Sequence, residues 1–196
     1  MSVELGKEYM NIESNSVFLA QYDPPAYKEF TGVAAPELPA GAVNTVALGL
    51  LRDLLKNAGL DSARHGTAQW NPLGDLIRQG DKVLLKPNWV LDENRLRGGG
   101  MDCLVTHSSV VEAVLHYVVK AQPGQIVVGD APLQNCDFEN LRAKCGLDDM
   151  CARFKQLGYE IQIRDFRLEK MKGRFSDRIR TDPDPNNYCL FDIGEK

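Results

Sequence analysis

Two stretches of the chain repeat apolar residues at helical spacing. The first runs from about Val43 to Ala58 and is followed by Gly59, a residue that commonly ends helices. The second begins with the capping-box pattern Ser109-Val110-Val111-Glu112 and runs to about Ala121. We predict an amphipathic helix over each stretch. Three shorter helices are expected at 73–78, 137–144 and 147–157.

Short apolar runs predict the strands of a sheet. Residues 82–86 (KVLLK) and 125–129 (QIVVG) are continuous apolar runs between turn residues, the pattern of strands covered on both faces. Residues 159–164 alternate between apolar and polar positions, as a third strand would. A further strand is expected at 16–22, and another at 188–193, where the chain ends.

The order of these elements predicts the fold class. Residues 82–129 are predicted to form a strand, a loop, a helix and a second strand, the order of a right-handed parallel crossover. An α/β domain with a mainly parallel sheet follows from it. We divide the chain into an N-terminal strand and loop (1–42), an α/β core (43–166) and an exposed excursion with the start of a further strand (167–196). Because that strand begins where the sequence stops, we expect the chain to be a fragment of a longer protein.

Composition excludes several classes of protein. With 196 residues, 43% of them hydrophobic and 26% charged, the chain can bury one sizeable core. Its 23 basic and 27 acidic residues give a net charge of −4, which argues against a nucleic-acid partner. No apolar run reaches the roughly 18 residues of a membrane span, and the N-terminus lacks a signal-peptide pattern. A cytoplasmic location is expected, and the oligomeric state is left open.

The cysteines indicate reduced thiols. Five of them are scattered along the chain without a Cys-x-x-Cys pair, whereas iron–sulfur and structural zinc sites usually take closely spaced ligands. We therefore expect no iron–sulfur cluster within this chain. The cofactor is otherwise left open, with a divalent metal ion as one candidate.

Candidate chemistry gathers where a parallel sheet usually binds ligands, beyond the carboxyl ends of its strands. Lys86 ends the first strand and Asn88 follows it, and both would bind a small anion. His107 precedes the helix, where its imidazole could transfer a proton, and Asp130 ends the second strand as a candidate catalytic acid. The ligand site would also include Ser108 and Gln134.

Each of these residues also has a structural explanation. The aliphatic part of Lys86 could pack at the end of the strand while its ammonium is solvated, and Asn88 could stabilise a turn. His107 could pack on its loop while a neighbour caps the helix. Asp130 could bond to its own turn, and Gln134 could simply precede the next helix. The sequence leaves both interpretations open for each residue.

Three blocks in these segments resemble a known family. They are KVLLKPNWV (82–90), VTHSSVVEAVLHYV (105–118) and IVVGDAPLQNCDFENL (126–141). In this order they are similar to the bacterial and archaeal family called domain of unknown function 362, and the likeness spans most of residues 16–165. The resemblance implies a Rossmann-like three-layer α/β domain of largely uncharacterised function, usually longer than this chain. The resemblance also implies relatives fused to ferredoxin-like iron–sulfur segments and relatives associated with surface-polysaccharide genes.

Three hypotheses for function follow. The leading one is an enzyme that acts on a small anionic or polar metabolite, with a sugar-derived compound among the candidates. The second is a non-catalytic ligand-binding or scaffold module. The third is an electron-transfer subunit completed by an iron–sulfur segment that this chain lacks. The residues do not choose among hydrolysis, epimerisation and group transfer.

Overall fold

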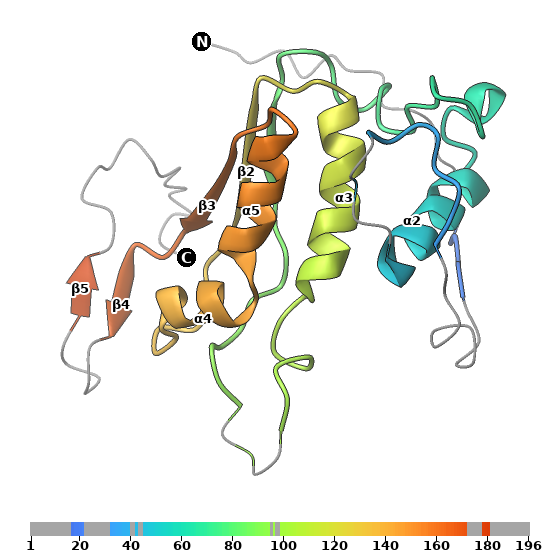
Figure 1. The fold of residues 1–196 in the computed structure, drawn as a ribbon. Helices are drawn as coiled ribbons and strands as arrows, with labels where there is room; N and C mark the ends of the chain where they lie inside the picture. The colour runs from blue at the N-terminus through green and yellow to red at the C-terminus, as the bar shows by residue number, and fades with distance from the viewer. Residues whose placement is uncertain are drawn as a thin grey trace, which may run out of the picture.

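The computed structural model describes residues 17–21, 32–39, 42, 45–94, 96, 99–171 and the backbone of 178–180 (Figure 1). The elements follow in the order α2 (Val46–Asn57), η1 (Ser62–Arg64), β1 (Lys82–Leu85), α3 (Ser108–Lys120), β2 (Gln125–Asp130), α4 (Phe138–Lys144), α5 (Leu147–Gln156), β3 (Ile161–Asp165), β4 (Glu169–Met171) and β5 (Arg178–Arg180). None of the described helices has the length and hydrophobicity to span a bilayer.

A three-stranded parallel sheet in the order β1-β2-β3 organises the domain. Leu85 lies opposite Val128, and Val128 lies opposite Ile163, so the three strands end at the same edge. This arrangement confirms the predicted α/β fold and the parallel pairing across the 82–129 crossover. A separate two-stranded antiparallel sheet pairs β4 with β5.

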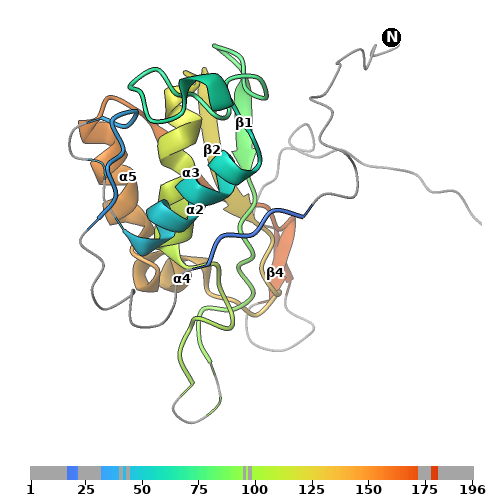
Figure 2. The same ribbon diagram turned by 90° about the vertical axis from the view of Figure 1, so that its right-hand side faces the viewer.

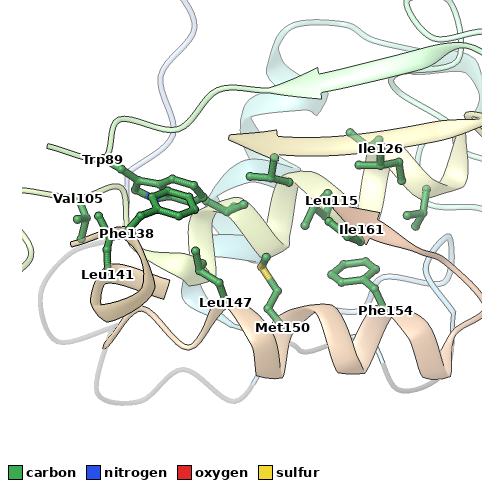
Figure 3. Close-up of a cluster of buried hydrophobic side chains, with 14 of the residues drawn as sticks. Trp89, Val105, Leu115, Ile126, Phe138, Leu141, Leu147, Met150, Phe154 and Ile161 are labelled. Atoms are coloured by element: carbon green, nitrogen blue, oxygen red, sulfur yellow. The ribbon is translucent and has the colours of Figure 1, made fainter. Parts of the chain in front are cut away.

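The main core lies between one face of the sheet and the helices α3 and α5. Figure 3 shows Leu115 of α3 and Phe154 of α5 directed toward Ile126 of β2 and Ile161 of β3, and all four are buried. Removing apolar surface of this size from water is the main stabilising contribution to such a domain. The core fixes α3 against the sheet and thereby the place where α3 begins.

A second cluster joins α2 to α3. Leu48 of α2, Trp70 of the following loop and Tyr117 of α3 are each at most 1% exposed, and Trp70 meets Tyr117 edge to face with 5.6 Å between ring centroids. Figure 2 shows α2 crossing α3. Thr45 caps α2, and Ala58 ends it before Gly59, which has a φ of 73°. The predicted helix is confirmed over its described part.

One face of the sheet differs from the expectation. We predicted that residues 82–86 would be covered on both faces, yet β1 is an edge of the described sheet and Leu84 is 58% exposed. Leu84 points away from α3 because successive side chains of a strand alternate between faces. Within the described ranges, helices cover one face of the sheet. The described residues therefore form two layers, one of strands and one of helices, where three were expected.

Several predicted elements also differ. Residues 73–78 form turns and a bend rather than a helix. Gly74 N–H donates to the Asn71 carbonyl and Leu76 N–H to the Leu73 carbonyl, and a single i→i+4 bond from Ile77 N–H to Leu73 does not continue into a helix. Residues 17–21 do not form the expected strand. Arg167 is 2% exposed, so the segment from 167 does not begin as an exposed excursion. The strand expected at 188–193 lies outside the described residues.

Candidate functional site

The loop that precedes α3 runs beside the chain leaving β1. Trp89 and Val105 form an antiparallel bridge. One step further, Thr106 N–H donates to the Asn88 carbonyl at 2.8 Å, and Asn88 N–H donates to the Thr106 hydroxyl at 2.9 Å. The predicted segments 86–88 and 106–108 therefore lie together at the carboxyl edge of the sheet, as the parallel topology requires.

Lys86 and Asp130 form an ion pair at this edge. The Lys86 Nζ atom lies 2.7 Å from Asp130 Oδ1, and the two side chains are 63% and 6% exposed. Asp130 also accepts from Trp89 N–H at 2.7 Å and from Ala131 N–H at 2.8 Å. Burial alone would raise the pKa of Asp130, but these hydrogen bonds outweigh it and lower the pKa, so the carboxylate is ionised at neutral pH.

A hollow of about 350 Å³ opens beside the pair. Lys86, Asn88 and Thr106 supply its polar side, and Leu85, Pro87, Val110, Val111 and Val114 supply its apolar side. Two of the predicted site residues, Lys86 and Asn88, line it. The described lining of this hollow does not include His107, Ser108, Asp130 or Gln134.

His107 caps α3. Its Nδ1 accepts from Ser109 N–H at 3.2 Å and lies 2.8 Å from the Ser109 hydroxyl. The predicted capping box from Ser109 to Glu112 does not form, because Glu112 accepts two hydrogen bonds of 2.8 Å from Arg153 of α5. With Nδ1 as an acceptor, the neutral imidazole carries its proton on Nε2, and the side chain is exposed.

Ser108 and Gln134 lie on the segments that enter α3 and leave β2. Ser108 is the first residue of α3 and is half-buried. Gln134 has an exposed side chain, and its carbonyl accepts from Met171 N–H at 3.0 Å. That bond joins the loop after β2 to β4.

Arg167 is the main feature of this region that the sequence interpretation missed. Its guanidinium binds both oxygens of Asp165, with a closest approach of 2.6 Å, and donates to the carbonyls of Leu133 and Cys136 at 2.9 Å. These bonds hold the loop after Asp130 against the end of β3. The one sequence signal is an arginine two residues after an acid at the end of a strand.

The described residues contain no group of three or more histidine, cysteine, aspartate or glutamate side chains that could hold a metal ion. Among the thiols, Cys136 is buried, and burial raises its pKa to about 11, so it is protonated at neutral pH. Cys189 lies outside the described residues.

Comparison with known protein families identifies a match to a central segment of the chain. Residues 83–177 match the family model described as Domain of unknown function (DUF362), and this segment contains Lys86, Asn88, His107 and Asp130. The resemblance predicted from the three sequence blocks is thereby confirmed. No curated protein and no solved structure matches the chain.

Proposed function

We propose that the chain binds a small anionic metabolite in the hollow beside Lys86 and acts on it as an enzyme. The observation that carries the proposal is the ion pair of Lys86 with Asp130 at the rim of that hollow. A partly exposed ammonium, oriented by a buried acid at the carboxyl edge of a parallel sheet, is suited to holding a carboxylate or phosphate.

Asp130 acts in this proposal as a positioning residue. Its carboxylate is 6% exposed and already accepts from two backbone N–H groups and from Lys86. Lys86 has three ammonium hydrogens, and among the described residues Asp130 is its ion-pair partner. The remaining hydrogens of the ammonium can bond to an anion in the hollow without breaking the pair.

His107 is the group proposed to transfer a proton. It follows Thr106, which lines the hollow, and its Nε2–H is a donor in the neutral ring. When the ring is protonated on both nitrogens, it can give up the Nε2 proton as a general acid, while its Nδ1–H donates to the Ser109 hydroxyl 2.8 Å away. Ser108, at the start of α3, adds the favourable end of the helix dipole.

Binding can be tested by thermal unfolding with sugar phosphates, nucleotides and di- and tricarboxylates. We expect at least one anion class to raise the melting temperature, Lys86→Met to abolish the rise, and Lys86→Arg to retain part of it. Lys82→Met is the matched control, because Lys82 is exposed at the other end of the same strand. The binding proposal fails if no class stabilises the protein, or if Lys86→Met responds like the native chain.

Catalysis needs a separate test. Incubation with each stabilising anion, followed by NMR or mass spectrometry, should detect a product from the native chain. The His107→Asn variant keeps a side-chain acceptor that can cap α3 but has no imidazole. We expect it to bind the anion and to lose turnover. Binding without any product from the native chain would instead identify a ligand-binding module.

A further inference from the structure

Two hollows meet at Val110, in the first turn of α3. The hollow beside Lys86 is bounded by Val110 and Val111. A larger one, of about 550 Å³, is bounded by Ser109 and Val110 of α3, by α2 and by the segment that includes Phe18. Val110 is 46% exposed and lines both hollows, so it forms the ridge between them.

The larger hollow is almost entirely apolar, whereas the smaller one has polar side chains on one side. Apart from Ser109, every described residue that lines the larger hollow is apolar; the set includes Val46, Leu50 and Leu54 of α2. The smaller hollow is apolar along α3 and ends at the ammonium of Lys86 and at Asn88. A ligand that followed both hollows would have one charged end and a long apolar body.

We infer that the anion bound at Lys86 is the head group of a long-chain amphiphile, whose chain crosses Val110 into the groove along α2. This inference rests on the proposed function and specifies the class of substrate. The negative head complements Lys86, and the chain complements the apolar side chains of Leu50 and Leu54. The occupant is a single dissolved molecule with a carboxylate or phosphate head, rather than a bilayer surface.

A chain-length series tests the inference. Straight-chain carboxylates and monoalkyl phosphates, from short to about twelve carbons and below their micelle concentrations, are titrated by calorimetry. Each methylene that is fully buried raises affinity about fourfold. We expect affinity to rise at least tenfold between four and eight carbons. Equal affinities for short and long chains would overturn the amphiphile while leaving the anion site intact.

Variants locate the chain and the head separately. Val110→Gln and Leu50→Gln should flatten the dependence on chain length without weakening the shortest anions. Leu76→Gln is the control, because Leu76 is also 46% exposed but lines neither hollow. Lys86→Met should weaken every chain length by a similar factor. A dependence that persists in Val110→Gln and Leu50→Gln, or long chains that bind Lys86→Met normally, would overturn the inference.

The two proposals fail in different ways. If no anion of any length binds, the anion site itself is wrong and the amphiphile fails with it. If binding appears only with micelles or vesicles of the same amphiphiles, the protein recognises a surface, and the inference of a single bound molecule is overturned. Circular dichroism of each variant before titration confirms that the helices remain folded.

Discussion

Lys86 Nζ lies 2.7 Å from Asp130 Oδ1, and the pair joins the ends of two neighbouring parallel strands. The Asp130 carboxylate has a fixed position, because it is buried and also accepts from Trp89 and Ala131 N–H. Lys86 is the exposed partner. The pair therefore combines a fixed acid with a cation that reaches solvent, which is the basis of the proposed anion site.

The first prediction concerns Asp130→Asn. In the native protein the Asp130 carboxylate accepts from Trp89 N–H, Ala131 N–H and the Lys86 ammonium. In the variant, one of the two oxygens is replaced by an NH₂ group, which cannot accept, and the negative charge is lost. We therefore expect the free energy of unfolding to fall by about 2 kcal/mol at neutral pH. The pKa of Asp130 is lowered in the folded state, so its stabilising effect is present above its ordinary pKa of 3.8. That effect is lost as the pH falls through the folded-state pKa.

Urea unfolding measures this change. Asp148→Asn is the control, because Asp148 pairs with Arg142 while 65% exposed, and exposed pairs contribute less than about 1 kcal/mol. Equal losses in the two variants would contradict the role assigned to Asp130.

Local patterns were enough to predict much of this arrangement. Continuous apolar runs located β1 and β2, and apolar stripes located α2 and α3, because burial imposes those periodicities. The strand–helix–strand order then predicted that Lys86 and Asp130 would lie at one edge, and the structure joins them directly.

Contacts between distant residues could not be predicted in this way. Glu112 fits a capping box, but Arg153 of another helix binds it, and His107 caps α3 instead. Arg167 is an arginine in a charged segment, and its burial depends on carbonyls about 30 residues earlier. The exposure of Leu84 follows from its place on the sheet face that no described helix covers, which the apolar run does not reveal.

The second prediction concerns Arg167. Its side chain is 1% exposed, and Arg167→Met would leave Asp165 and the carbonyls of Leu133 and Cys136 without this donor. We expect a loss of about 3 kcal/mol in urea unfolding, together with faster proteolysis of the loop over 131–137. The control is Arg164→Met, since Arg164 is exposed. An unchanged proteolysis rate would show that Arg167 does not hold the loop.

The third prediction uses Gly129, directly before Asp130. A Cβ atom there would lie 2.6 Å from the Arg164 carbonyl oxygen and 2.6 Å from the Phe166 ring. Because the carbonyl belongs to the neighbouring strand, Gly129→Ala should cost about 1–3 kcal/mol. Gly100→Ala, where a Cβ meets no atom within 4 Å, is the matched control. Comparable midpoints for the two variants in thermal unfolding would exclude the close approach of β2 and β3 as a constraint.

The fourth prediction concerns the buried acid Glu37. It is 4% exposed, accepts from Arg52 at 2.8 Å and accepts from the Tyr117 hydroxyl at 3.1 Å. Arg52→Met should lower the free energy of unfolding by about 3 kcal/mol, because it removes the side chain that forms an ion pair with this buried carboxylate. Tyr117→Phe should cost about 1.5 kcal/mol, the contribution of one hydrogen bond to a charged group.

Denaturant titrations of both variants are compared with Glu139→Gln, whose parent side chain is 78% exposed in its ion pair. That change should cost less than about 1 kcal/mol. A Tyr117→Phe loss larger than that of Arg52→Met would mean that Tyr117, rather than the ion pair, stabilises Glu37.

The fifth prediction concerns His116, which is 2% exposed and packs with its ring centroid 5.0 Å from that of Phe154. Among the residues that the structure describes, neither ring nitrogen has a hydrogen-bond partner. Burial lowers the pKa of His116 below its ordinary 6.5, while Glu112 opposes this change and Arg153 adds to it. The folded protein therefore holds a neutral imidazole, whereas the unfolded chain takes up a proton near pH 6.5.

Stability should consequently be complete above that ordinary pKa and should fall as the pH is lowered through about 6.5. His116→Leu removes the titrating group, so its free energy of unfolding should fall less between about pH 8 and pH 5.5. His65 contributes to the pH dependence of stability that remains in this variant, because burial also lowers the pKa of His65. Urea unfolding across this range provides the measurement, and the values at the alkaline end serve as the internal control because both imidazoles are neutral there. If the native and His116→Leu curves stay parallel down to pH 5.5, His116 is not a source of acid sensitivity.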